Sequence, residues 1–535
     1  MGETDQTYDT IIVGGGPAGC ALAARLADTR PGQTVALIEA GPAKSGLLSD
    51  VPIGIAFLLP RKSARNSAYT TVPQPGLGGR RGFQPRGRGL GGSSLINGMV
   101  YTRGHSTDYD DWEDAGCPGW GFRDVLPYFK RSEHNERGGD DFHGTGGPLN
   151  VADLRDPNPL SSAFVQAGVE AGYHATSDFN GAEQEGFGLY QTYQKHGQRW
   201  NAARAYLGDR QRPNLHVLTD AQVQRIVFDG RRAAGVAVRR DGAMQILHAR
   251  AEIVLAAGAF GSPQLLMASG VGPAAHLKQH GIAVVHDSPE VGSNLQDHLD
   301  YVIVRKVSNR LLIGTTPGWM IQVMPDILRW KRERRGPVTS NLAEAGAFIK
   351  SDPALPRPDL QLHFVIGIAD DHGRKLHLAR GLSVHVCVLR PKSRGTVRLA
   401  SADTADMPLI DPGYFSAVAD LDALAEGVRI TRRVMAAPSF ARLGGRDVHG
   451  RGDEDGEALR DMIRARADTI YHPVGTCRMG GDASAVLDSE LRVRGLDGLR
   501  VADASIMPTL VGGNTQAASA MIGEKCADLM TRANT

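Results

Sequence analysis

The stretch that decides the fold is YDTIIVGGGPAGCALAARL, residues 8–26. Residues 8–13 form the apolar run of a short buried strand, and residues 17–26 carry apolar side chains at helical spacing. Gly14 and Gly16 lie in the turn between them, and Gly19 follows in the helix. Such a turn places bare backbone beside a pyrophosphate and aims the helix N-terminus at its charge. The stretch therefore predicts a dinucleotide-binding βαβ unit.

Glu39 strengthens this interpretation. It ends a second apolar run, residues 34–38, where a carboxylate would accept hydrogen bonds from ribose hydroxyls and repel the 2′-phosphate of NADP. The glycine pattern is weak by itself, because residues 87–92 match it as well without an apolar strand before them. The complete unit predicts a bound dinucleotide but leaves NAD and FAD both open.

Length and composition limit the alternatives. A chain of 535 residues exceeds the roughly 250–300 residues at which single cores stop growing, so two domains are expected. The formal net charge of +2 gives no field that would attract nucleic acid. Five cysteines without a CxxC pair predict neither disulfides nor a metal site and favour a reducing, cytoplasmic compartment. No signal peptide or membrane-spanning run is recognised.

The predicted cofactor domain is assembled from distant pieces of the chain. Apolar runs at 253–257 and 499–502 indicate further strands of the same sheet, and a helix is expected near 516–530. Alternating patterns at 382–388 and 395–399 predict antiparallel strands in a second domain. The expected fold is α/β. It has a Rossmann-like cofactor domain (1–155, 215–310 and 465–535) and an α+β substrate domain built on an antiparallel sheet (156–214 and 311–464).

Four further segments resemble blocks of the glucose-methanol-choline (GMC) oxidoreductases. They are GRGLGGSSLIN (87–97), GAFGSPQLL (258–266) followed by SGVG (269–272), NLQDH (294–298) and YHPVGT (471–476). With the N-terminal turn and residues 503–514, they span the chain in the order of that family. Within the family, residues 197–200, 371–375 and 391–395 make the chain most similar to bacterial medium-chain alkanol dehydrogenases, with polyethylene glycol and choline dehydrogenases as neighbours.

The resemblance implies an FAD-binding domain of the GMC type and oxidation of a primary alcohol to an aldehyde by hydride transfer to flavin. It assigns the base to His472, because a positioned imidazole can take the hydroxyl proton near neutral pH. Asn514 would hold the substrate oxygen, at a position where some relatives have a second histidine. FAD contacts are implied for Gly14, Gly16, Gly19, Glu39, Gly91, Ser94, Asn97, Gly98, Val223 and Asp503.

The mode of FAD binding and the type of reaction also follow from the resemblance. Ile96 occupies the position where some relatives bond the flavin through a histidine, so non-covalent FAD is expected. We expect a dehydrogenase that passes electrons to a quinone or another acceptor other than oxygen. Choline dehydrogenase and an oxygen-using alcohol oxidase are the alternatives, followed by a lyase of the hydroxynitrile type and a photodecarboxylase. Glu344 either faces the pocket or supports a loop.

Residues 311–335 leave two interpretations open. The segment is rich in Ile, Leu, Met and Trp and ends in a cluster of basic residues at 329–335. An apolar face beside basic residues suits peripheral contact with the cytoplasmic face of the inner membrane. A lid that packs on its own protein fits the same pattern. The sequence predicts no oligomeric state.

Overall fold

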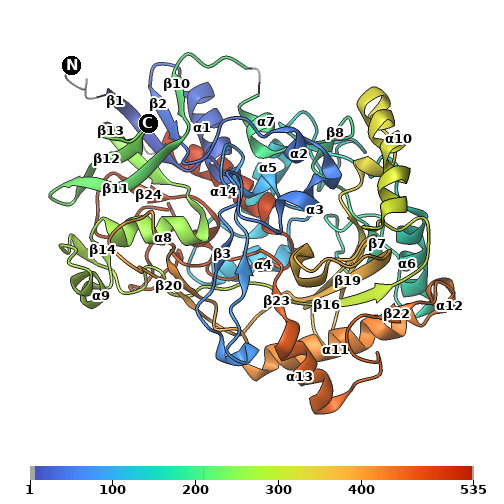
Figure 1. Ribbon diagram of the computed structural model, residues 1–535. Helices are drawn as coiled ribbons and strands as arrows, with labels where there is room; N and C mark the ends of the chain where they lie inside the picture. Colours follow the sequence, from blue (N-terminus) through green and yellow to red (C-terminus); the bar gives the residue numbers. More distant parts are fainter. Residues whose placement is uncertain (1–5, 209, 533–535) are drawn as a thin grey trace.

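The fold contains two large β-sheets with helices packed on them (Figure 1). The computed structural model describes residues 6–208 and 210–532. In the first sheet the strand order is β10-β2-β1-β13-β12-β11, and β24 pairs with β13. The bounds are β1 Gln6–Val13, β2 Val35–Ile38, β10 Leu215–Leu218, β11 Ala221–Asp229, β12 Arg232–Arg240, β13 Ala243–Leu255 and β24 Leu499–Val501.

The centre of this sheet is parallel, as the buried apolar runs predict. β1 pairs in parallel with β2 and with β13, and β24 pairs in parallel with the end of β13. Helix α1 (Pro17–Thr29) follows β1, and helix α14 (Thr515–Arg532) lies against α1. The contact is close, because a Cβ on Gly523 would lie 2.3 Å from the Ala18 carbonyl oxygen. The N-terminal unit and the C-terminal helix thus form one body.

The second sheet has the order β22-β16-β19-β18-β17-β7, with β23 beside β16. All its strand pairs are antiparallel, as the alternating pattern predicts. The bounds are β7 Gly186–Leu189, β16 Leu299–Lys306, β17 Ala343–Ile349, β18 Leu360–Val365, β19 Gly381–Val388, β22 Arg446–Asp447 and β23 Asp468–Thr469.

Strand β18 shows how this sheet separates core from site. Successive side chains of a strand point to opposite faces. Leu360, Leu362 and Phe364 join the apolar core formed with helices α6 (Pro159–Glu170) and α11 (Val418–Met435). His363 and Val365 line a cavity on the other face. One face of the second sheet therefore packs against helices in the apolar core, and the other face lines the cavity.

Strand pairing departs from the predicted domain boundaries at two places. β16 (299–306) and β23 (468–469) belong to the second sheet, although boundaries at 310 and 465 place both in the cofactor domain. The reason is that the chain changes sheets directly after the block at 294–298 and again just before the block at 471–476. In addition, the strand expected at 395–399 appears as β20 (Thr396–Arg398), which pairs with β21 (Leu409–Asp411) in a separate two-stranded ribbon.

Candidate active site

A cavity of about 1020 Å³ is lined by residues of both sheets. At one end lie the glycine turn after β1 and the end of β2. At the other end lie β18, β19 and the segment 470–473. Residues 514–516 at the start of α14 form part of the wall between the two ends. The cavity therefore connects the predicted nucleotide site with the predicted catalytic pair.

The glycine turn has the backbone that the sequence requires, but its three glycines differ in role. Gly14 has φ +112°, and a Cβ there would lie 2.3 Å from the Ala256 carbonyl oxygen. Gly14 and Gly16 line the cavity. Gly19 does not, and a Cβ on it would lie 1.9 Å from the Gly14 carbonyl oxygen. The structure thus gives Gly19 a packing role between helix and strand, and its contact with the cofactor stays a prediction.

Glu39 joins three backbone segments around the nucleotide end of the cavity. One carboxylate oxygen accepts from the backbone N–H of Gly15 (2.9 Å), and the other accepts from those of Gly41 (2.8 Å) and Gly89 (2.9 Å). The side chain also lines the cavity. Among the hydrogen bonds of the described residues, the first oxygen accepts only the one from Gly15, so it retains a lone pair that suits a ribose hydroxyl. The contact to ribose remains a prediction.

The loop 87–98 supplies small and polar groups to the cavity wall. Ser94, Asn97 and Gly98 line the cavity, whereas Gly91 does not. The Gly91 N–H donates to the Gly15 carbonyl oxygen (2.7 Å), so this glycine ties its loop to the first glycine turn. Ile96 also lines the cavity with an alkyl side chain. No atom of that side chain can form the covalent flavin bond of a histidine.

Val223 and Asp503 are also placed on the cavity wall. One Asp503 oxygen accepts from the Gly258 N–H (2.8 Å) and the Ser262 hydroxyl (2.5 Å), and the other accepts from the Ser505 N–H (2.8 Å). Burial raises the pKa of this carboxyl group. Asp503 therefore holds the start of helix α8 (Gly258–Ala268) beside the cavity, and a contact to FAD remains a prediction.

His472 is fixed from two sides by the block at 294–298. Its backbone N–H donates to Asp297 (2.9 Å), and its Nδ1 lies 2.9 Å from Nδ1 of His298. The preceding residue, Tyr471, has φ +79°, an uncommon value for a residue with a side chain. Strained backbone of this kind recurs at functional sites. The chain is thus bent to bring the His472 ring to the cavity.

The contacts of His298 determine which nitrogen of His472 is free. Nε2 of His298 lies 3.1 Å from the Leu389 carbonyl oxygen, which can only accept, so Nε2 carries the proton. In the neutral ring Nδ1 of His298 is then an acceptor. It follows that Nδ1 of His472 carries its proton and donates it to His298. The lone pair of His472 is left on Nε2, the nitrogen 3.2 Å from Nδ2 of Asn514.

Asn514 has a fixed amide orientation. Its Oδ1 accepts from the Thr102 hydroxyl (3.1 Å) and from Nε2 of Gln361 (3.2 Å), while its backbone N–H donates to the Thr102 oxygen (2.8 Å). These bonds leave the amide NH₂ directed at His472. The His472 ring and the Asn514 amide therefore meet at one point of the cavity wall, and their roles as base and hydrogen-bond donor stay predictions.

The surroundings of His472 keep it neutral. Burial lowers its pKa well below the usual 6.5, and the neighbouring His298, His363 and Arg86 lower it further. Burial also lowers the pKa of His298 and of His363 to about 3. A neutral imidazole with a free Nε2 is the form that accepts a proton.

Arg86 tests whether the cavity suits an anionic cofactor. Its guanidinium is buried and lines the cavity, with the ring of Phe260 5.8 Å away. Within the described residues, its Nε and NH2 atoms have no hydrogen-bond partner. Burial of a cation without such partners is costly. Phosphate or carbonyl oxygens of FAD would satisfy it, so the residues of this cavity fit the cofactor.

Glu344 does not face the cavity. Its carboxylate accepts from the Ser340 hydroxyl (2.6 Å), the Ser161 hydroxyl (2.8 Å) and the Asn158 N–H (2.7 Å). It is buried and absent from the cavity lining. Of the two interpretations left open, the structure supports the one in which Glu344 holds a loop.

Several site residues have no assigned role in the sequence interpretation. Thr102 and Gln361 orient Asn514 from sequence positions more than 150 residues away. His363 and His385 line the cavity from β18 and β19, and His385 lies 2.6 Å from Asp300. Of these residues, only His298 lies inside a block that resembles the family, 294–298, and that position could have marked it as a site residue. Among the described residues, no cluster of His, Cys, Asp and Glu is arranged to hold a metal ion.

Comparisons with known proteins cover almost the whole chain. Models of the GMC oxidoreductase family match residues 8–300 and 391–523. The "Alcohol dehydrogenase [acceptor]" of Pseudomonas putida is 49% identical over 98% of this chain and 96% of its own. An "Oxygen-dependent choline dehydrogenase" of Rhizobium johnstonii is 41% identical over 97% and 95%. The crystal structure of pyridoxine 4-oxidase from Mesorbium loti superposes with a TM-score of 0.88, 32% identity and 98% and 99% coverage.

Proposed function

This chain belongs to the GMC oxidoreductase family, and we propose that its base is His472 and its substrate an apolar primary alcohol. FAD-dependent oxidation of an alcohol is the activity of the enzyme. The observation that carries the proposal is the position of Nε2 of His472, an acceptor nitrogen that lies 3.2 Å from the Asn514 amide on the cavity wall.

The side chains divide the chemistry between them. Nε2 of His472 takes the hydroxyl proton as the carbon–hydrogen bond breaks, since a free alkoxide is costly near neutral pH. The Asn514 amide donates a hydrogen bond to the substrate oxygen and keeps it beside the base without adding charge. Bound FAD supplies the acceptor for the hydride. The charge that His472 gains is shared with His298 through the Nδ1–Nδ1 contact (2.9 Å).

The lining of the outer cavity supports an apolar substrate. Ile53, Ile313, Trp319, Val365 and Ile368 are among its residues. Within the described part of the chain, the only carboxylates that line the cavity are Glu39 and Asp503, both at the cofactor end. A quaternary ammonium would need a carboxylate or an aromatic cage around it. This lining ranks choline, the substrate in the name of the Rhizobium relative, below an aliphatic or benzylic alcohol.

We also infer that FAD is held without a covalent bond, because Ile96 offers no nucleophile. Trichloroacetic acid should release the yellow colour into the supernatant, and a coloured pellet would contradict this. The proposed acceptor is a quinone rather than oxygen. The proposed location is the cytoplasm, on the inner face of the membrane that holds the quinone.

Replacement of the base tests the proposal. His472→Ala should bind FAD but reduce it with alcohol about 10²–10⁴-fold more slowly, the usual contribution of a general base. Anaerobic stopped-flow absorbance with 1-octanol, a benzylic alcohol, a polyether alcohol and choline measures both the rate and the preferred substrate. His377→Asn is the matched control, because His377 lines the same cavity but pairs with Asp370 (2.7 Å) instead of Asn514.

Three outcomes separate the alternatives. Near wild-type flavin reduction by His472→Ala would exclude His472 as the base. Failure of every alcohol to bleach the flavin of the wild-type enzyme would favour a lyase or a photodecarboxylase. Rapid reoxidation by air in preference to a quinone would indicate an oxidase.

A further inference from the structure

Helix α10 (Pro317–Glu333) is bound to the rest of the protein mainly at its two ends. Figure 1 shows it in yellow at the periphery of the molecule. Near its C-terminus, Nε1 of Trp330 donates to the Gly197 carbonyl oxygen (2.8 Å). Near its N-terminus, Trp319 lines the cavity and Arg380 donates to Gln322 (2.6 Å). Among its described side chains, only that of Trp330 is buried. One face of this 17-residue amphipathic helix is therefore not covered by the rest of the described protein.

The free face is apolar. Ile321, Met324 and Leu328 are 76%, 57% and 52% exposed. Their spacing of three and four residues places them along one side of the helix. Large exposed apolar side chains are common singly but are unusual as a contiguous stripe. The stripe therefore needs a partner that covers it.

Two other segments bring apolar side chains to the same place, the mouth of the cavity. Phe57 of α3 (Ile55–Leu58) and Leu376 line the cavity and are 59% and 71% exposed, so the cavity opens between them. Leu378 is 75% exposed. Its segment adjoins the start of α10, since the Thr315 N–H donates to the Ala379 carbonyl oxygen. We call these six residues, Phe57, Ile321, Met324, Leu328, Leu376 and Leu378, the mouth surface.

Basic side chains surround the mouth surface. Arg61 and Lys62 follow α3, and Arg374 and Lys375 precede Leu376; all four are exposed. At the end of α10, residues 329–335 hold five basic residues and one acid. Glu333, the acid, is paired with Arg329 (3.2 Å). An apolar surface with a cationic rim is complementary to lipid chains below anionic headgroups. A second protein would need matching shape, whereas a bilayer needs only this distribution.

We propose that the mouth surface docks the enzyme on an anionic phospholipid membrane, so that the cavity opens toward the bilayer. An apolar alcohol dissolved in the membrane then reaches the cavity without crossing water. This inference rests on the proposed function for the nature of the substrate. It extends the expectation for residues 311–335, because α3 and the loop at 374–378 take part and the surface surrounds the cavity entrance.

Vesicle cosedimentation tests the proposal. The holoenzyme should bind to vesicles of phosphatidylcholine and phosphatidylglycerol (3:1) at low salt. Its binding to vesicles of phosphatidylcholine alone should be at least tenfold weaker. The triple variant Ile321→Ser, Met324→Ser, Leu328→Ser should lose at least tenfold in partition coefficient. The double variant Lys331→Gln, Arg332→Gln should have a partition coefficient several-fold below that of the wild type. The difference should be smaller at high salt, because salt screens the attraction between these cations and the anionic headgroups.

Matched variants far from α10 serve as controls. Met244→Ser, Ile246→Ser and Val418→Ser remove exposed apolar side chains elsewhere, and Arg239→Gln with Arg240→Gln removes exposed charges. All should bind vesicles like the wild type. Every variant should reduce its flavin with a short, water-soluble alcohol at the wild-type rate, because none of these residues lines the cavity. Slow flavin reduction by these variants with the short alcohol would count against the proposed function and not against the membrane-binding role of the mouth surface.

Two outcomes would overturn the proposal. One is a wild-type enzyme that stays in the supernatant with anionic vesicles at low salt. The other is a wild-type dimer, measured by analytical ultracentrifugation, that the α10 triple variant converts to a monomer without change in vesicle binding. The second result would assign the stripe to a second copy of the chain.

Discussion

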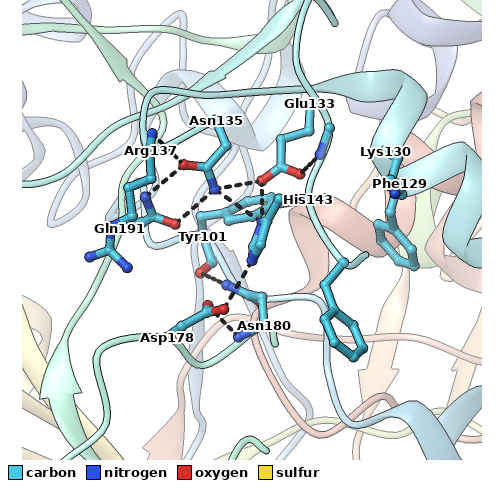
Figure 2. Close-up of polar contacts among 12 residues, drawn as sticks. Tyr101, Phe129, Lys130, Glu133, Asn135, Arg137, His143, Asp178, Asn180 and Gln191 are labelled. Carbon is cyan, nitrogen blue, oxygen red and sulfur yellow. Dashed lines mark hydrogen bonds and ion pairs between the residues drawn. The ribbon is translucent and has the colours of Figure 1, made fainter. Parts of the chain in front are cut away.

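Two buried histidines of this enzyme have opposite electrostatic surroundings. Figure 2 shows His143 between two carboxylates, with Nδ1 3.0 Å from Glu133 and Nε2 3.0 Å from Asp178. Burial by itself would lower its pKa, but the hydrogen bonds to Asp178 and Glu133 outweigh burial and raise the pKa to about 9. His143 is therefore a cation at neutral pH. It joins the segment 133–144 to the segment 177–180.

His472 is equally buried but has bases and a cation around it. Its ring contacts His298 and Asn514, and no carboxylate accepts from its ring nitrogens among the hydrogen bonds of the described residues. Burial, His298 and the nearby charges hold its pKa well below 6.5. The difference teaches that the partner, and not burial, decides the role. Two carboxylates make a buried histidine a structural cation at neutral pH, whereas burial without a carboxylate partner keeps His472 neutral and reactive.

The largest expected effect comes from removing the carboxylate that joins the His143 cluster. Glu133 also pairs with Arg103, whose guanidinium is buried. Glu133→Gln should lower the free energy of unfolding by about 3–5 kcal/mol, because it leaves the buried Arg103 without its paired carboxylate and removes one of the two carboxylates beside His143. The midpoint of urea denaturation measures this. Asp153→Asn, which breaks the exposed pair with Arg137, should cost under about 1 kcal/mol. Equal costs for the two variants would contradict the role of Glu133.

Alkaline pH should loosen the same cluster by titrating His143. Its pKa in the folded protein, about 9, lies above the ordinary 6.5 of the unfolded chain. The stability that it contributes is therefore complete below about pH 6.5 and is lost as pH rises through about 9. Melting temperatures of the wild type and His143→Gln should differ most near pH 6 and converge above about pH 9. Parallel curves throughout would exclude a charged His143.

A smaller effect is expected from His298, which we infer to be a positioning residue for His472. His298→Leu should slow flavin reduction about 10–100-fold, because Nδ1 of His472 loses its acceptor and the lone pair on Nε2 is no longer fixed. His298→Asn retains an oxygen that accepts near the same place and should recover most of the rate. Anaerobic stopped-flow with FAD titration checks both. Equal losses in the two variants would indicate a packing role only.

Much of the cofactor end could be predicted from the sequence, because its signals are local. The turn at Gly14 and Gly16 and the acid at Glu39 lie within one βαβ unit, so spacing alone indicates their proximity. The cofactor contacts of Gly19, given by the same spacing, and of Gly91, given by the family resemblance, stay predictions, since a glycine needed for close packing looks identical to one needed for a ligand. In the structure both pack against the first glycine turn.

The substrate end could be predicted only where the family resemblance marked a block. His472 and Asn514 were found in this way, but Thr102, Gln361 and His363 were not. Their place at the site depends on strand pairing between β18 and its neighbours and on the contact of β18 with the 102 and 514 segments. Pairings of that kind join residues far apart in sequence, and the alternating pattern of a strand does not specify which face will meet the cofactor.

The composite first sheet has a consequence for biosynthesis. β24 and α14 enter the fold about 250 residues after their partner β13 in the order of translation. Asn514 and the residues at the start of α14 close the cavity wall. A nascent chain that has completed β1, α1 and β13 therefore has the glycine turn but no finished pocket. FAD capture should therefore follow the synthesis of β24 and α14, and the supply of FAD at that point would influence how much of the new protein matures.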